Sequence, residues 1–166
     1  MRFSTRTRYG LRFLLRLAAQ PPGSLLQLGQ VAREERISSG YLEQIVRALK
    51  PLGILKAVRG TGGGYALAKP AADINMEDVF LHLEGEIAPV RCLTTNKPCT
   101  HEGQCSTRAF WQALDRHMRE FLRSCTLQEM SEQCKTTPGA GAASEEVAKG
   151  GALSGGTYVE LYRSRP

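Results

Sequence analysis

The sequence lacks a long apolar run. A membrane-spanning helix needs about 18 or more consecutive apolar residues, and no window of the 166 residues approaches that length. Near the N-terminus, Arg12 and Arg16 bound the apolar run 13–15, so no usable core of a secretory signal is present. We therefore expect a cytoplasmic protein with no membrane partner, whose thiols are reduced or metal-bound.

Motifs for catalysis are also scarce. No Cys-x-x-Cys redox motif occurs among the five cysteines, which makes a thiol or electron-transfer enzyme a weak alternative. The glycine-rich run 60–64 begins as nucleotide-binding fingerprints do, but no Gly-Lys-Ser/Thr ends it, and a strand is predicted to follow it rather than a helix. We predict no catalytic residues and expect a protein that is not an enzyme.

Acidic residues are few in the N-terminal third. Residues 1–60 hold eleven Lys/Arg and three Asp/Glu, a net charge of +8, so the other 106 residues carry −2 of the total of +6. Such asymmetry is typical of a surface that meets phosphate or an anionic membrane, although a solvated charged face is the plain alternative. Charge alone does not separate these interpretations.

The first 83 residues carry the pattern of three helices and a hairpin. Apolar residues at positions 11, 14, 15 and 18 form one stripe of a helix between Thr5 and Gln20. A shorter apolar face around Val31 predicts a second helix, and Ser38 and Ser39 are suitable N-caps for a third. Strands are predicted at 54–58 and 65–68, on either side of the glycines. This is the element order of a winged helix-turn-helix.

Further helices are predicted after this head. Asn75 is the expected cap of a helix that buries Val79 and Leu83, and Thr126 with Glu129 fits a capping box for a last short helix. Between them, a long helical pattern from residue 106 carries a narrow apolar stripe. Its members are Trp111, Leu114, Met118, Phe121, Leu122 and Cys125. Such a stripe suits burial against a second copy of the chain as readily as against the head.

These patterns predict a mainly α-helical protein in four segments. Residues 1–83 form a winged helix-turn-helix DNA-binding domain with a two-stranded wing, and residues 84–105 form a loop that contains three of the five cysteines. Residues 106–134 form a dimerisation helix and a short helix. Residues 135–166 are rich in Thr, Pro, Gly, Ala and Ser and are expected to be disordered.

The outer face of the third helix is the first candidate DNA-binding surface. At its start, Ser38, Ser39 and Tyr41 can donate hydrogen bonds to phosphates, and further along Gln44 and Arg47 can reach base edges. Phosphate repels Glu43 unless its carboxylate accepts from a cytosine amine, so Glu43 would discriminate among DNA sites rather than add affinity. An exposed polar face on a core helix is the alternative interpretation.

The glycine-rich hairpin is the second candidate surface. A simple tight turn needs one or two glycines, whereas four occur between residues 60 and 64. We interpret the run as a wing tip, in which Gly62 and Gly63 let the backbone approach the sugar-phosphate while Arg59 reaches into the minor groove.

Three cysteines, Cys92, Cys99 and Cys105, lie in one polar loop. Their intervals of six and five residues are wider than the Cys-x2-4-Cys pairs of structural zinc, and they favour an iron-sulfur cluster over zinc, a disulfide or buried packing. The fourth ligand is unknown: His101, a residue of a partner subunit or an exchangeable small molecule could supply it. Cys125 is expected in the core, and Cys134 has no assigned role.

The combined motifs resemble those of the IscR-like and NsrR-like iron-sulfur regulators of the Rrf2 family of bacterial transcription factors. The resemblance covers about residues 1–133. It rests on residues 1–3 with Tyr9, on the runs 37–44 and 58–65, and on the three cysteines ahead of Trp111. It implies a homodimer with a winged-helix head, a long crossing dimerisation helix and a cluster loop that links ligand state to affinity for palindromic operators in double-stranded DNA.

The resemblance also implies residue roles. The DNA-reading residues would be Tyr41, Glu43, Gln44 and Arg59, and the cluster ligands would be the three loop cysteines. IscR-type members carry a histidine three residues after the third cysteine, where this chain has Arg108, which stays protonated and cannot ligate. NsrR-type members take a carboxylate from the partner's first helix, where this chain has Arg8. The cluster type, 2Fe-2S or 4Fe-4S, therefore stays open.

The sequence thus predicts a DNA-binding transcriptional regulator, expected to be a repressor. We expect it to sense iron-sulfur cluster status, iron, or redox or nitrosative stress. A regulator with the same DNA-binding head but with a cluster-free thiol switch or a zinc site is the alternative.

Overall fold

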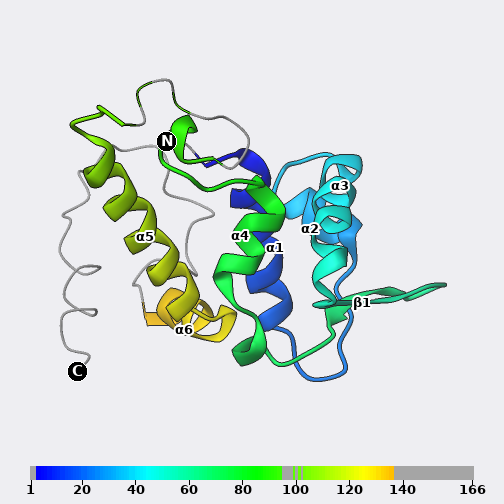
Figure 1. Cartoon of the computed structure of the whole chain (residues 1–166). Coiled ribbons are helices and arrows are strands. Elements are labelled where there is room, and N and C mark those ends of the chain that lie inside the picture. Colours follow the sequence, from blue (N-terminus) through cyan, green and yellow to red (C-terminus); the bar gives the residue numbers. More distant parts are fainter. Residues whose placement is uncertain (1–2, 95–98, 100, 102, 137–166) are drawn as a thin grey trace, which may run out of the picture. The chain divides into compact units, whose positions relative to one another are not determined.

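Six α-helices and a two-stranded sheet make up the part of the chain that the structure describes. This computed structural model describes residues 3–94, 99, 101 and 103–136 (Figure 1). The helices are α1 (Thr5–Ala18), α2 (Leu28–Glu34), α3 (Ser39–Leu49), α4 (Met76–Glu84), α5 (Arg108–Ser124) and α6 (Leu127–Thr136), and the strands are β1 (Leu55–Val58) and β2 (Gly64–Leu67). The predicted fold class, a mainly α-helical winged helix-turn-helix, is confirmed.

Residues 1–134 form one unit and residues 135–166 a second. The tail that we expected to be disordered lies outside the described residues, except for Lys135 and Thr136, which complete α6. Six residues of the cysteine loop, 95–98, 100 and 102, also lie outside them. Among the described helices, none is long and apolar enough to cross a bilayer.

The core of the head lies between α1, α3 and α4, which pack against one another. Phe13 of α1, Ile45 of α3 and Leu83 of α4 are at most 1% exposed. Gly10 lies where these helices meet, because a Cβ atom there would lie 2.7 Å from Leu83 Cδ1 and 3.4 Å from Ile45 Cγ2. Close approach at Gly10 therefore fixes how α1 crosses the other two helices.

Local signals set the helix starts. Ser38 caps α3 by accepting a hydrogen bond from the Tyr41 amide at 3.1 Å, and Asn75 caps α4 by accepting from the Glu77 amide at 2.9 Å. The predicted capping box is also present, since the Thr126 hydroxyl accepts from the Glu129 amide and the Glu129 carboxylate accepts from the Thr126 amide. These three caps are confirmed.

The wing is anchored to the head by a third segment. Strands β1 and β2 pair antiparallel, and Leu26, just before α2, adds an isolated bridge to Tyr65 of β2 through two backbone hydrogen bonds of 2.8 and 2.9 Å. Gly64 is required at this junction, because a Cβ atom there would lie 2.8 Å from the Leu26 carbonyl oxygen. The base of the wing is therefore held against the start of α2.

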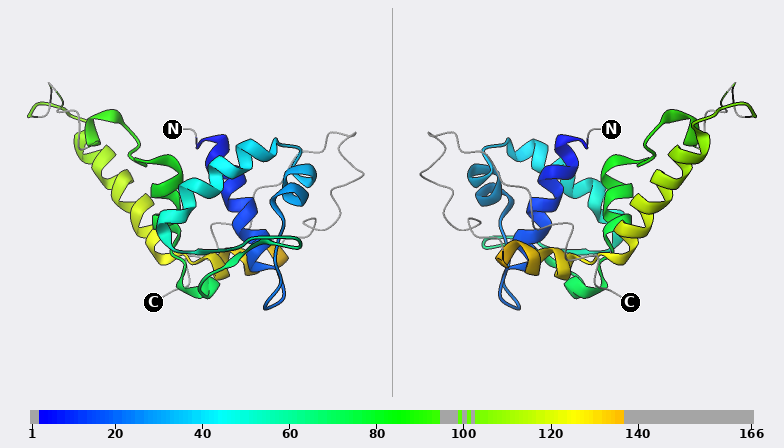
Figure 2. Two further views of the ribbon diagram at one scale, coloured as in Figure 1. Left: turned by 90° about the vertical axis from the view of Figure 1, so that its right-hand side faces the viewer. Right: turned by 90° about the vertical axis from the view of Figure 1, so that its left-hand side faces the viewer.

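Helix α5 is fastened to the head at its C-terminal end. Leu122 is its buried residue, and Cys125 directly after it is also buried. The Asn75 side chain donates to the Arg123 carbonyl at 2.7 Å, and an isolated bridge joins Asn75 to Thr126. The other end of α5 adjoins the cysteine loop and lies away from α1 and α3 in Figures 1 and 2.

Two sequence expectations about α5 need correction. The helix begins at Arg108 rather than near residue 106, and Cys125 follows it as the C-cap instead of continuing its stripe. The predicted stripe also divides: Leu122 and Cys125 face the head, whereas Leu114 and Phe121 are 36% and 42% exposed. The ion pairs that join α5 to Glu77 of α4 come from Arg119 and Arg123, in the C-terminal half of α5, where the buried part of the stripe lies.

Candidate DNA interface and cysteine loop

The start of α3 is held by aromatic and hydroxyl contacts from α1. The Tyr41 hydroxyl lies 2.9 Å from the Thr5 hydroxyl, within hydrogen-bonding distance, and its ring packs edge-on against Tyr9 with ring centres 6.2 Å apart. The guanidinium groups of Arg8 and Arg12 lie over the Tyr9 ring at 5.3 and 5.6 Å. The contacts to Tyr41 orient the first turn of α3, and the stacked Arg8 keeps positive charge beside it.

The polar face of α3 is open to solvent. The side chains of Glu43 and Arg47 are 54% and 74% exposed and lie 3.9 Å apart, one helical turn from each other. Gln44 beside them is exposed as well. A pair this exposed contributes little to stability, so both side chains are available to an incoming ligand, and Arg47 offsets the charge of Glu43.

The wing tip is a tight turn closed by a 2.9 Å hydrogen bond from the Gly63 amide to the Gly60 carbonyl. Gly60 and Gly62 have φ angles of +102° and +82°, which side chains rarely adopt. A Cβ atom at Gly63 would lie 2.4 Å from the Val58 carbonyl oxygen. At least three of the four glycines are thus required by the turn itself, and Arg59 beside them is exposed.

The structure brings the predicted DNA-binding residues to the surface on two elements. Those on or beside α3 are Ser38, Ser39, Tyr41, Glu43, Gln44 and Arg47, and those on the wing are Arg59, Gly62 and Gly63. Of these, Tyr41 and Gly63 are partly buried and the others are exposed. Their roles in DNA binding stay predictions.

Part of the N-terminal basic charge has an internal partner that the sequence did not indicate. Arg12 forms a 2.7 Å ion pair with Glu35, and Arg16 forms a 3.1 Å ion pair with Glu35 and another with Glu34. These pairs fasten α1 to the C-terminal end of α2 and neutralise two of the cations counted toward a phosphate surface. The sequence offered no local signal, because the paired residues are 18 to 23 positions apart.

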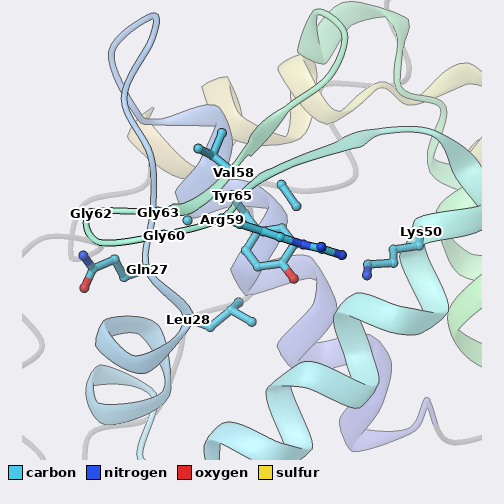
Figure 3. Close-up of a pocket in the computed structure, with 11 residues that line it drawn as sticks. Gln27, Leu28, Lys50, Val58, Arg59, Gly60, Gly62, Gly63 and Tyr65 are labelled. Carbon is cyan, nitrogen blue, oxygen red and sulfur yellow. The ribbon is translucent and has the colours of Figure 1, made fainter.

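A hollow of about 510 Å³ opens between the wing and the head (Figure 3). Arg59 and the turn glycines line one side of it, and Gln27 and Lys50 line the other. The sequence analysis assigned no role to Gln27 or Lys50. Lys50 could have been named as a candidate, because it directly follows the predicted third helix. That it lies close to the wing depends on the tertiary fold.

The three loop cysteines are partly buried, and none is in a disulfide. The Cys105 Sγ atom lies 3.4 Å from the Thr107 hydroxyl. This hydrogen bond, with further ones from the backbone amides of Thr107 and Arg108 and the charge of Arg108, lowers the pKa of the Cys105 thiol. A thiol with a lowered pKa is the better soft-metal ligand and also the more reactive toward oxidants.

Whether these residues fit an iron-sulfur cluster depends on their donor chemistry and on how close together they lie. Three thiols in one loop are suitable donors for iron or zinc. Among the described residues, however, no three His, Cys, Asp or Glu side chains converge closely enough to hold a metal ion. His101 is exposed, and Arg108 begins α5. The donor chemistry fits, but the described residues do not form a preassembled cage.

A three-helix head with an exposed third helix and a glycine-turned wing defines a winged-helix protein of the DNA-binding type. The chain belongs to the Rrf2 family, described as iron-dependent transcriptional regulators, whose profile matches residues 3–133. It is 34% identical to the Rrf2 protein of Nitratidesulfovibrio vulgaris over 138 residues, which cover 83% of this chain and 92% of the relative.

Solved structures support the same conclusion. The global cysteine regulator CymR of Bacillus subtilis aligns with a TM-score of 0.65 and 32% identity, over 80% of this chain and 98% of its own. IscR of T. potens aligns with a TM-score of 0.63 and 29% identity, over 81% of this chain and 88% of its own. This chain is therefore a DNA-binding transcriptional regulator by family, and its relatives include both CymR-type and IscR-type proteins.

Proposed function

We propose that this protein is a homodimeric transcriptional repressor that binds a palindromic operator in double-stranded DNA. The observation that supports it most directly is the exposed face of α3, capped by Ser38 and flanked by a wing that carries Arg59. In a winged helix-turn-helix, such a helix enters the major groove while the wing reaches the adjacent minor groove.

Salt dependence tests this proposal. If six to ten phosphates are contacted, raising the salt from about 50 to about 200 mM should weaken binding about 10³- to 10⁵-fold. The measurement is fluorescence anisotropy of a duplex taken from upstream of the protein's own gene. Binding that does not change with salt would count heavily against a DNA-binding regulator.

The proposed dimer forms through α5. Phe110, Leu114 and Phe121 expose 63%, 36% and 42% of their surface along this helix. Apolar surface of this kind on one helix is typical of a subunit interface. Two heads joined through α5 would present two α3 helices to the two halves of a palindrome.

The proposed sensor is the loop with Cys92, Cys99 and Cys105, which would hold a labile iron-sulfur cluster of 2Fe-2S or 4Fe-4S type with a fourth ligand still to be identified. When bound, the cluster would supply a group that is sensitive to redox state and nitric oxide. Cys105 lies three residues before Arg108, the first residue of α5. Any reordering of the loop would therefore move the free end of a helix whose other end is fastened to α4.

Coupling of this kind does not need a large free energy. About 1 to 3 kcal/mol between loop state and DNA binding changes operator affinity about 5- to 150-fold. Movement of α5 in both subunits would change the distance between the two α3 helices, and hence their fit to the operator.

The alternative function keeps the DNA-binding head and makes the cysteines a thiol switch or a zinc site. The lowered pKa of Cys105 and the match to a cysteine regulator favour it. Anaerobic purification separates the two. A brown protein with charge-transfer absorbance that is lost in each single Cys→Ala variant supports the cluster, and a colourless protein with stoichiometric zinc, or with no metal, supports the alternative.

A further inference from the structure

The hollow between the wing and the C-terminal end of α3 is lined by cations on both sides. Lys50 is the C-cap residue of α3, and Arg59 follows β1. Both are exposed. Figure 3 shows their side chains extending toward each other across the hollow, with the Tyr65 hydroxyl close by. Two elements that are adjacent in the fold thus direct positive charge into one space.

The charge in the hollow has one sign. Lys50 and Arg59 are the charged residues among the described residues that line it, and neither forms an ion pair within the described part of the chain. Two cations that face each other repel unless an anion lies between them. Internal pairing satisfies Arg12 and Arg16, but it leaves these two side chains for a partner from outside.

The position of the hollow indicates which anion fits. The proposed DNA-binding mode places α3 in the major groove and the wing in the adjacent minor groove. A sugar-phosphate strand separates two adjacent grooves, so it must pass between the helix and the wing. The hollow opens between the wing and the C-terminal end of α3, beside the start of α2, and its volume of about 510 Å³ leaves room for a phosphate group and its sugar.

We infer that this hollow seats one backbone phosphate of the operator, held by Lys50 at the edge of the minor groove that Arg59 enters. The inference rests on the proposed DNA-binding function and adds to it a contact residue outside the face of α3. A phosphate contact positions the protein but carries no base information. Lys50 therefore contributes equally to the affinity for operator DNA and for non-operator DNA.

The plain alternative is that Lys50 stabilises α3 through the negative end of the helix dipole. That role changes thermal unfolding but not the salt dependence of DNA binding. The two roles can therefore be separated by variants that keep or remove the charge.

The test compares full-length wild type with Lys50→Gln, Lys50→Arg and the matched control Lys69→Gln, whose lysine is exposed but outside the hollow. Binding to the upstream duplex and to an unrelated duplex of equal length is measured by anisotropy between about 50 and 200 mM salt. Thermal unfolding followed by circular dichroism checks that each variant is folded.

For Lys50→Gln we expect weaker binding to both duplexes, by about tenfold at 50 mM salt and about threefold at 200 mM, and a salt slope that is shallower by about 1. Lys50→Arg and Lys69→Gln should keep the wild-type slope. Unchanged binding by Lys50→Gln, or a loss confined to the upstream duplex, would overturn the phosphate seat while leaving the DNA-binding function intact. Wild type that binds neither duplex would overturn both proposals.

Discussion

At the scale of single residues, the candidate interface combines backbone constraint with exposed charge. The wing turn requires glycine at Gly60, Gly62 and Gly63, either for a positive φ angle or because a Cβ atom would meet a carbonyl oxygen. On α3, Glu43 and Arg47 are exposed and only weakly paired. A pair this exposed adds little to folding stability, so changes at Glu43 and Arg47 should alter binding more than folding.

Arg59→Ala tests the wing assignment. We expect operator binding to weaken by about 1 to 3 kcal/mol, because the variant loses a contact in the minor groove. Anisotropy with the upstream duplex measures this loss, and the midpoint of thermal unfolding should stay within a few degrees of wild type, since Arg59 is exposed. Unchanged affinity would show that the wing does not touch DNA.

Gly63→Ala tests the turn itself. The added Cβ atom would lie 2.4 Å from the Val58 carbonyl oxygen and 2.9 Å from the Gly60 carbonyl oxygen, so the turn must open. We expect operator binding to weaken at least as much as in Arg59→Ala. The matched control is Gly29→Ala on α2, where the nearest atom is an Arg33 guanidinium nitrogen at 3.7 Å; a comparable loss in both variants would contradict this explanation.

At the scale of elements, the joint between α4 and α5 is the feature that links the loop to the head. Glu77 of α4 is buried and forms ion pairs with two arginines of α5, at 2.5 Å with Arg123 and at 3.8 Å with Arg119. Arg119 also pairs with Asp115 at 2.9 Å. Together with the Asn75–Thr126 bridge, these contacts fix one end of α5, so α5 is fastened to the head near its C-terminal end.

Glu77→Gln should loosen this joint. The variant removes the charge that both arginines share, and we expect the midpoint of thermal unfolding to fall by about 2 to 8 °C. It should also weaken the effect of loop oxidation on operator affinity. A loosely held α5 would pass less of the movement of the cysteine loop on to the head. The control is Glu120→Gln, on the exposed face of α5, which should change neither the midpoint of thermal unfolding nor the effect of loop oxidation.

At the scale of the whole molecule, the exposed apolar face of α5 argues for a dimer. We expect Phe110→Ser to raise the dimer dissociation constant by about 5- to 30-fold, because a large aromatic side chain at an interface contributes about 1 to 2 kcal/mol or more. Sedimentation velocity over a concentration series measures the change. Phe3→Ser removes a similarly exposed aromatic residue from the segment just before α1 and should leave dimer association unchanged. Equal effects of the two substitutions would contradict a specific α5 interface.

How much the sequence could predict follows from the range of each interaction. The caps at Ser38, Asn75 and Thr126 join residues two or three positions apart, so the sequence displays them directly. The glycines of the wing are equally local. In contrast, the pairing of Arg12 with Glu35 and of Arg123 with Glu77 joins residues 23 and 46 positions apart, and no periodicity reveals it.

The sequence by itself determined the order of the elements, the starts of α3, α4 and α6, the glycine turn and the family. These depend on local hydrogen bonds, backbone sterics and apolar periodicity. Only the tertiary structure decided which arginines are paired internally, that α5 divides its apolar stripe between the head and solvent, and that Lys50 faces Arg59 across a hollow. Those outcomes depend on which helices meet, and that is settled by packing across the chain rather than along it.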